Sequence, residues 1–265
     1  MKVYISADIE GTTATTLWDE TSRSQPYYAA AARQMTMEVK AACEGAIDAG
    51  ADFILVKDAH GSGTNIDITQ LPRCVELIRS GCGHPYTMAY GVEQGFDAAM
   101  FIGYHSGAGR NGNPLSHTFT KRPAQVRLNG QVCSEFTLFS LVANSEKVPP
   151  VLLTGDRMLC EDSANMYPLL KTVAVKDGLG GMTRSIHPEV ACERIRSAAK
   201  EALEQDLTKG LIEMPKKFEF EITYKEHDNA VSMSYYPGFS LVGDRTIRME
   251  TTDYMDVMRA VKFVL

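Results

Sequence analysis

The chain has 265 residues, of which 44% are hydrophobic and 23% are charged, and its formal net charge is −6 at pH 7. This length is enough for one large domain, or for two smaller ones, with a sizeable buried core. Because the chain is acidic and has no run of basic residues, we expect neither nucleic acid nor a membrane as its partner.

The first predicted element is a strand that runs from Lys2 and ends in two acids, Asp8 and Glu10, followed by Gly11. Successive side chains of a strand point to opposite faces, so the two carboxylates point the same way. Their mutual repulsion is offset most directly by a divalent cation. The alternative interpretation is a solvated turn after an edge strand, because acids are common turn formers.

A polar stretch over residues 12–24 contains Trp18, the single tryptophan, and we expect it to be a loop that contacts the site or a neighbouring subunit. Apolar residues then recur at helical spacing over residues 27–49, and Gly50 follows at the expected stop. Residues 52–56 form a short apolar run, so strand, helix and strand make a βαβ unit with parallel strands. Unbroken apolar strands suit a sheet that is covered on both faces.

Polar groups also follow two further strands. The run over residues 52–56 leads into Lys57-Asp58-Ala59-His60, and the run over residues 98–103 leads into Tyr104-His105. In open parallel sheets, ligands bind beyond the carboxyl ends of the strands. Three strands that each end in an acid or a histidine followed by glycine therefore indicate one shared site.

The middle of the chain continues the alternation of strands and helices. His117 follows the turn-rich residues 110–114, and Asn129-Gly130 is typical of a tight hairpin turn. Further elements are expected at residues 134–144 (a helix with Glu135 in its first turn), 151–156 (a strand ending in Asp156), 160–167 (a helix), 172–175 (a strand) and 189–207 (a helix that begins after Pro188).

The character of the sequence changes from Phe218. Residues 218–224 alternate strictly between apolar and polar, which is typical of an antiparallel strand with one solvated face. A short strand over residues 246–249 and a helix over residues 253–263, capped by Thr252, follow. The sequence thus predicts an α/β fold with two parts: a mostly parallel sheet flanked by helices over residues 1–215, and a smaller β-rich subdomain ending in a helix over residues 216–265.

Six cysteines are dispersed along the chain without a Cys-x-x-Cys pair, at Cys43, Cys74, Cys82, Cys133, Cys160 and Cys192. In a long chain without an export signal we expect them to stay reduced and mostly buried, with little weight on a Cys74–Cys82 disulfide. No apolar stretch is long enough to span a bilayer, and no signal peptide is recognisable. We therefore expect a cytoplasmic protein.

Three of the six histidines, His60, His105 and His117, lie in glycine-rich loops after or near strands. Together with Asp8, Glu10 and Glu135 they form a mixed set of imidazole and carboxylate groups. Such ligands suit zinc, and by ligand type also manganese or iron. The set is larger than one tetrahedral zinc requires, which favours two metals that share a bridging carboxylate. We interpret the remaining histidines as structural or surface residues, namely His84, His187 and His227.

The chain resembles the zinc-dependent D-aminopeptidase family of the self-compartmentalising, dipeptide-operon type. The resemblance is carried by an ordered set of short stretches at residues 6–11, 56–60, 101–105, 116–117, 129–135 and 154–157. Their order and spacing match over the first two-thirds of the chain, while the last third matches only loosely. One departure is Ser134, because the family usually has glycine directly before the acid that falls on Glu135.

The resemblance implies a metallopeptidase with two zinc ions per subunit and a homo-oligomeric assembly, a decameric ring. The ligands it implies are Asp8, Glu10, His60, His105 and Glu135, with Asp8 as the bridge, and the family's catalytic histidine falls on His117. It also implies that domain 1–215 is catalytic. The expected reaction is release of an N-terminal D-amino acid, such as D-Ala, from short peptides by metal-activated water.

His117 would then shuttle protons or stabilise the oxyanion, while a direct nucleophilic role is less economical beside a metal-activated water. Asp58 and Asp156 are candidates either to hold the free amine of a substrate or to orient the ligand histidines. Three other functions compete with the peptidase. They are a metal-dependent amidase or lactonase on the same scaffold, a two-metal phosphoesterase, for which no phosphate-binding cluster is obvious, and a non-catalytic ligand-binding or structural assembly protein, whose apolar last helix could pack between subunits.

Overall fold

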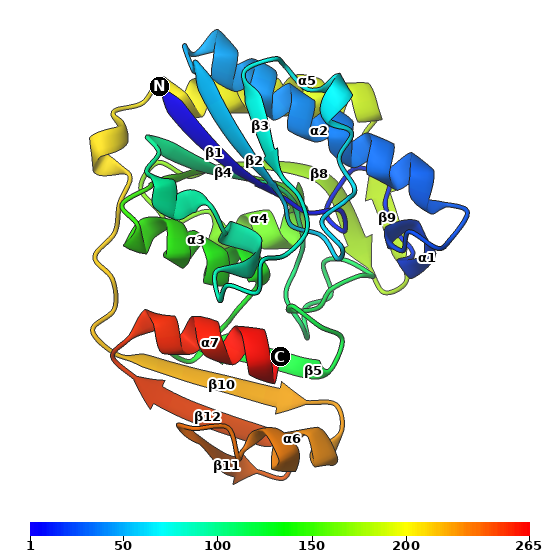
Figure 1. Cartoon of the computed structure of the whole chain (residues 1–265). Helices are drawn as coiled ribbons and strands as arrows, with labels where there is room; N and C mark the ends of the chain where they lie inside the picture. The colour runs from blue at the N-terminus through cyan, green and yellow to red at the C-terminus, as the bar shows by residue number, and fades with distance from the viewer.

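The computed structural model describes all 265 residues, which form two sheets and the helices around them (Figure 1). The larger sheet has seven strands: β1 (Lys2–Ala7), β2 (Phe53–Asp58), β3 (Val75–Ile78), β4 (Ala98–Tyr104), β7 (Pro150–Asp156), β8 (Lys171–Leu179) and β9 (Met182–Ser185). Their order in space is β3-β2-β1-β4-β7-β8-β9. All neighbours pair in parallel except β8 and β9. The predicted mostly parallel α/β sheet is thus confirmed.

The position of β1 determines where a ligand can bind. From β1 the chain moves outward to β2 and β3, and then returns to place β4 on the other side of β1. The strand order therefore reverses between β1 and β4. At such a switch point the loops that follow neighbouring strands diverge and leave a crevice beyond their carboxyl ends. The acids after β1 and the histidine after β4 lie at this crevice.

Helices cover both faces of the larger sheet. On one face, α2 (Tyr28–Asp48) and α5 (Pro188–Leu203) pack against side chains such as Ile5 and Met100; on the other, α3 (Glu135–Ser145) packs against Phe101. Two shorter helices are α1 (Trp18–Thr21) and α4 (Arg157–Ser163). Because both faces are covered, β4 and β7 are buried over their whole length, which explains their unbroken apolar sequences.

The second sheet is antiparallel and draws on two distant stretches of the chain. Its order is β11-β12-β10-β5-β6, with β5 (Pro123–Leu128), β6 (Gln131–Val132), β10 (Phe218–Tyr224), β11 (Phe239–Gly243) and β12 (Thr246–Thr251). Helix α7 (Tyr254–Val264) packs against β10 and β12 and shares one hydrophobic cluster with α3, while α6 (His227–Met233) packs against β10, β11 and β12. The division of the chain at residue 215 stays a prediction.

Local signals in the sequence are confirmed at several places. Asn129 and Gly130 both have positive φ, 50° and 78°, as a tight hairpin turn between β5 and β6 requires. Ser134 caps α3, because its Oγ accepts a hydrogen bond from the backbone N–H of Thr137. The strand over residues 218–224 alternates between buried and half-buried positions, as its pattern predicts.

Other boundaries differ from the prediction. Thr252 does not cap α7; Asp253 does, since its carboxylate accepts from the N–H of Met255 and suits the positive end of the helix. Helix α4 begins at Arg157 rather than at residue 160, because the carboxylate of Asp156 accepts from the N–H of Leu159. Short 3-10 helices lie at Ile68–Gln70, Thr87–Ala89, Val92–Gln94 and Leu207–Lys209.

All six cysteines are free, and Cys74 and Cys82 are not bonded to each other. None of the helices combines the length and the apolar character that a membrane crossing requires.

Candidate metal centre

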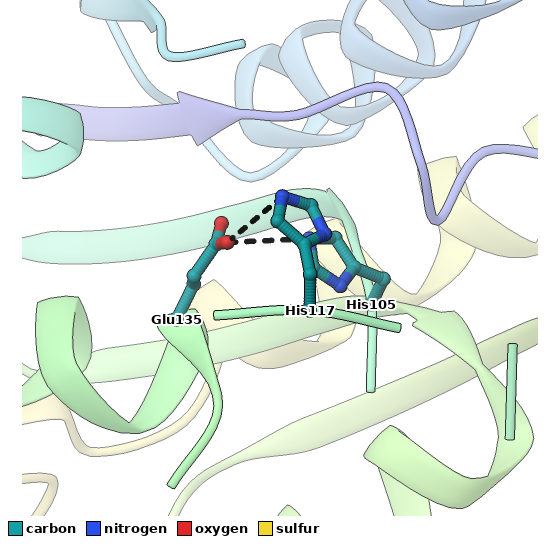
Figure 2. A group of neighbouring side chains, drawn as sticks. All are labelled: His105, His117 and Glu135. Atoms are coloured by element: carbon teal, nitrogen blue, oxygen red, sulfur yellow. Dashed lines mark ion pairs between the residues drawn. The ribbon is translucent and has the colours of Figure 1, made fainter. Parts of the chain in front are cut away.

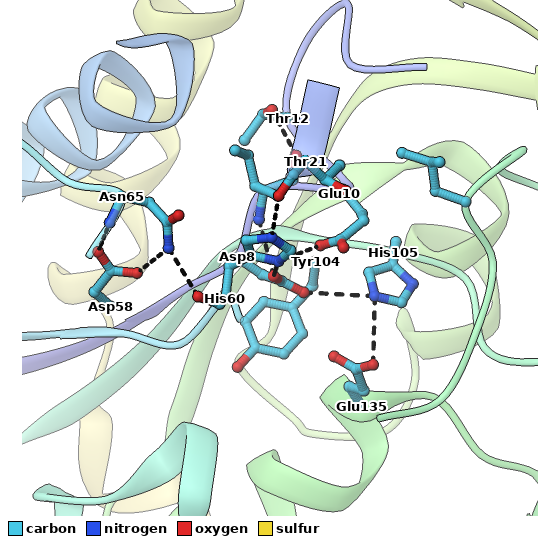
Figure 3. Close-up of polar contacts among 12 residues, drawn as sticks. Asp8, Glu10, Thr12, Thr21, Asp58, His60, Asn65, Tyr104, His105 and Glu135 are labelled. Atoms are coloured by element: carbon cyan, nitrogen blue, oxygen red, sulfur yellow. Dashed lines mark hydrogen bonds and ion pairs between the residues drawn. The ribbon is translucent and has the colours of Figure 1, made fainter. Parts of the chain in front are cut away.

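The six residues singled out from the sequence meet beyond the carboxyl ends of β1, β2 and β4. Asp8 and Glu10 follow β1, His60 follows β2 and His105 follows β4 (Figure 3). His117 comes from the loop before β5, and Glu135 is the first residue of α3. The parallel sheet thus gathers side chains that are up to 127 residues apart in sequence.

His60 lies between the two acids that follow β1. Its Nδ1 is 3.2 Å from Asp8 Oδ1 and 3.0 Å from Glu10 Oε2. Its other ring nitrogen, Nε2, is 2.8 Å from the backbone oxygen of Thr21 at the end of α1. An N–H at Nε2 donates to that oxygen, which leaves Nδ1 turned towards the carboxylates.

His105 and His117 face the same carboxylate oxygen. The Nε2 atom of each ring is 3.5 Å from Glu135 Oε1 (Figure 2). The rings are stacked with their centroids 4.4 Å apart and an interplanar angle of 6°. Each Nδ1 is 2.9 Å from a backbone oxygen, that of Ser106 for His105 and that of Leu115 for His117.

All three histidines therefore turn one nitrogen to a backbone carbonyl and the other to the acids. A hydrogen bond from one ring nitrogen to a carbonyl fixes the tautomer and leaves a lone pair on the other nitrogen. The lone pairs of His60, His105 and His117 thus point at the carboxylate cluster. Metal-binding histidines are held in the same way.

Two features of the cluster fit a bound metal: buried polar atoms that have no hydrogen-bond partner, and the distances between the possible ligand atoms. Asp8 Oδ2, Glu10 Oε2 and His105 Nε2 are buried and have no hydrogen-bond partner, although buried polar groups are normally satisfied. Zinc bonds of about 2.0–2.1 Å in tetrahedral geometry set neighbouring ligand atoms ~3.3 Å apart. The separations of 3.0 to 3.5 Å between nitrogen and oxygen atoms agree with that spacing.

Two overlapping groups of possible ligands can be distinguished. One consists of Asp8, Glu10 and His105, and the other of His105, His117 and Glu135. His60 extends the first group through its contacts with Asp8 and Glu10. Asp8 faces both sides, since its Oδ1 is 3.2 Å from His60 and its Oδ2 is 3.5 Å from His105.

The buried carboxylates of the cluster need positive charge nearby, which protons or a cation can supply. Burial, together with the neighbouring Glu10, raises the pKa of Asp8 to about 8. Burial opposes charge on His105, but the carboxylates of Glu135 and Asp8 outweigh it and raise the pKa of that imidazole to about 10. Burial and the adjacent His105 lower the pKa of His117. Protons thus compensate the buried carboxylates when no cation does so.

Asp58 supports the loop that carries His60. It accepts hydrogen bonds from the backbone N–H groups of Asn65 and Ile66, and from the Asn65 side chain. The same Asn65 side chain donates to the backbone oxygen of His60. Asp58 is fully buried and all its contacts are internal, so it orients a histidine loop and is not placed to hold the amine of a substrate.

Asp156 has the same kind of role at the other end of the crevice. It accepts from the backbone N–H and the hydroxyl of Ser106, directly after His105. Asn113 lies 3.4 Å from Asp156 Oδ2 and also donates to the backbone oxygen of Glu10. Asp156 too is fully buried and supports ligand loops.

Lys176 is a supporting residue that the sequence reasoning missed. Its ammonium donates to the backbone oxygens of Glu10 and Thr15, at 2.6 and 2.5 Å. It is 2% exposed, and burial lowers its pKa to about 8. The available signal was a lysine directly after the apolar run of residues 173–175, at the same sheet edge as the other site residues.

A cavity of about 590 Å³ opens onto the centre. Its lining includes Asp8, Glu10, His60, His117 and Glu135. Trp18, the first residue of the short helix α1 within the segment predicted as a loop, contributes as well, and its ring lies at 73° to the ring of His117 with the centroids 5.3 Å apart. The expectation that the segment over residues 12–24 contacts the site is thus confirmed, and its tryptophan packs against His117.

Comparisons with known proteins agree over nearly the whole chain. A family model described as peptidase M55, D-aminopeptidase, matches residues 1–263. The D-aminopeptidase of Bacillus subtilis strain 168 is 26% identical over 266 residues, which cover 98% of this chain and 95% of that protein. The solved structure of DppA from Bacillus subtilis, described as a zinc-dependent D-aminopeptidase and a self-compartmentalizing protease, superposes with a TM-score of 0.91 at 23% identity. The superposition covers 100% of this chain and 96% of the DppA chain.

Proposed function

The chain belongs to the peptidase M55 family of D-aminopeptidases, and from this premise we propose that it releases N-terminal D-amino acids, such as D-alanine, from short peptides with the help of two bound zinc ions. The observation that carries the proposal is the pair of overlapping ligand groups at the end of the cavity. Manganese or another divalent metal would suit the same donors.

The proposed ligands are Asp8, Glu10, His60, His105 and Glu135. The position of Asp8 supports a bridging role, because its two carboxylate oxygens face different histidines. His60 and Glu10 would complete one metal position, and His105 and Glu135 the other. When bound, the metals supply a Lewis acid that lowers the pKa of water and polarises a carbonyl group.

We assign the catalytic role to His117. It lines the cavity and its side chain is 14% exposed, whereas its stacking partner His105 is fully buried. Its Nδ1–H donates to Leu115, so Nε2 is the atom that can accept a proton from the attacking water and return it to the leaving amine. The rings of Trp18 and His105 both pack against the imidazole and favour this orientation.

We extend the proposal to assembly and compartment. The relative with a solved structure is described as self-compartmentalizing, and we propose that this chain likewise forms a homo-oligomer, a decameric ring. The six free cysteines suit a reducing compartment, which supports the cytoplasm as the place of action.

Metal analysis combined with a substrate panel tests the proposal. The purified protein should contain about two zinc ions per chain, lose its turnover of D-alanyl-D-alanine on chelation and regain it when zinc is added back. L-alanyl-L-alanine, a lactone and a simple amide serve as comparison substrates. Full turnover by the metal-free protein would refute the metal-dependent mechanism, and turnover confined to the amide or the lactone would refute the peptidase.

A further inference from the structure

The lining of the cavity in front of the centre includes positive charges that no carboxylate compensates. Three acids line it, Asp8, Glu10 and Glu135, and all three face the histidines of the centre. Two permanent cations line it as well, Arg23 and Lys121. The acids are thus committed to the metal centre, while the cations lie elsewhere in the lining.

Neither cation has an anionic partner. No carboxylate lies within 4 Å of Lys121 or Arg23, although many other exposed Lys and Arg side chains form ion pairs. Lys121 Nζ lies 3.6 Å from the ring centroid of Trp18, and the guanidinium of Arg23 donates one hydrogen bond, to the hydroxyl of Thr64. Most of their N–H donors are therefore available to a ligand.

Aromatic contacts hold Lys121 close to the catalytic side of the cavity. Its ammonium lies over Trp18, and the edge of Trp18 contacts the ring of His117. The cation–π contact restricts a long side chain that would otherwise sample many rotamers. A ligand bound to the ammonium would thus have its opposite end near His117 and the carboxylate cluster.

The ring of Trp18 links Lys121 to His117, with 3.6 Å from the ammonium to its centroid and 5.3 Å between the two ring centroids, a span on the scale of a short peptide. Each residue beyond the scissile bond adds about 3.5 Å of extended chain. One or two residues therefore bring a terminal carboxylate from the His117 side of the cavity towards Lys121, and Arg23 lines the same cavity. A carboxylate is the anionic group that every unmodified peptide carries at this end, and lysine and arginine are its usual partners.

We propose that Lys121, assisted by Arg23, forms a subsite for the α-carboxylate of di- and tripeptides, which makes the enzyme select free-acid peptides over their C-terminal amides. This inference rests on the proposed peptidase function and adds to it the recognition of the substrate's far end. The cavity lining has no carboxylate outside the metal centre that could pair with the free amine of a substrate. The charged selectivity of the cavity is therefore for the carboxyl end of the substrate.

The test compares D-alanyl-D-alanine with its C-terminal amide, which has the same scissile bond but no carboxylate. The wild type should prefer the free acid at least tenfold in kcat/KM. Lys121→Met keeps much of the apolar stem and should lower that preference about tenfold, mainly by raising KM for the free acid. Lys121→Arg should restore the preference, and Arg23→Gln should reduce it to a smaller extent.

Lys209→Met is the matched control, since Lys209 is exposed and lies outside the cavity lining. It removes the same charge and should leave the preference as it is in the wild type. If Lys121→Met lowered kcat/KM equally for the free acid and the amide, or lowered it for neither, the proposed subsite would be overturned. A zinc-loaded wild type that cleaves neither peptide would instead refute the proposed function, so the two failures are distinguishable.

Discussion

His105 and His117 present their Nε2 atoms to one and the same oxygen of Glu135, at 3.5 Å each, from rings stacked 4.4 Å apart. The two imidazoles nevertheless differ in their surroundings. His105 is sealed inside the protein, while His117 borders the cavity beside Trp18. Because of this difference in burial we propose His105 as a metal ligand and His117 as the catalytic group.

Replacement of His117 by alanine separates those roles. We expect His117→Ala to keep about two metals per chain and to lower kcat by about 10²- to 10⁴-fold, the usual contribution of general acid–base catalysis. Metal analysis and steady-state kinetics on D-alanyl-D-alanine provide the readout, with His227→Ala on the exposed start of α6 as control. A variant that loses metal would identify His117 as a ligand, and one with full turnover would remove it from the mechanism.

Asp8 and Glu10 are expected to differ in their effect on metal content. If Asp8 bridges, Asp8→Asn should weaken both metal positions and reduce the content from about two to below one per chain. The ion-pair contact of Glu10 is with His60, whereas Asp8 contacts both His60 and His105, so Glu10→Gln should leave about one metal. Elemental analysis after dialysis against a weak chelator measures the difference. Identical contents in the two variants would contradict the bridging assignment.

Lys176 should act on the centre through the backbone of Glu10. Lys176→Met removes the donors to Glu10 and Thr15, and we expect the affinity for zinc to fall about 10- to 100-fold, as for other residues that orient ligands. Lys171→Met is the control, because Lys171 lies on the same strand in an exposed ion pair with Glu201. Unchanged zinc affinity in Lys176→Met would show that Asn113 alone can hold the Glu10 backbone.

The buried carboxyl group of Glu38 should make the stability of the folded protein depend on pH. It is fully buried on α2 and accepts hydrogen bonds from Thr13 and Gln34, and burial raises its pKa. A carboxyl group whose pKa is higher in the folded than in the unfolded state binds more protons in the folded state. The free energy of unfolding therefore falls as the pH rises from the unfolded-state pKa to the folded-state pKa. Glu38→Gln should therefore raise the urea midpoint at pH 7.5 relative to the wild type, with a smaller difference at pH 4.5. A constant difference across pH would show that Glu38 does not titrate in this range.

Much of the centre could be predicted because it depends on local signals at strand ends. Asp8, His60 and His105 each follow a buried strand, and parallel strands place such residues at one edge. Membership of the D-aminopeptidase family confirms the resemblance seen in the spacing of these short stretches. The capping signal of Ser134 likewise fixes the start of α3, and with it the position of Glu135.

The missed features depend on contacts between distant parts of the chain. The position of Lys176 after an apolar run places it at the sheet edge of the site, but it does not indicate that the ammonium reaches the loop after β1, 161 residues away at Thr15. The pairing of β5 with β10 is equally non-local, so the sequence could not indicate that the C-terminal sheet includes residues 123–132. The misplaced cap of α7 is a smaller error, in which two adjacent residues could both accept the hydrogen bond.

The route of the chain through the two sheets has a mechanical consequence. The segment that carries His117 leaves the larger sheet at the end of β4 and enters the smaller one at β5, so its two ends are anchored in different sheets. The smaller sheet therefore helps to set the position of the His117 imidazole, to which we assign the catalytic role. A tilt of one sheet against the other would change the distance between His117 and the ligands that we propose on the larger sheet. A shortened chain without its last strands is expected to lose that alignment.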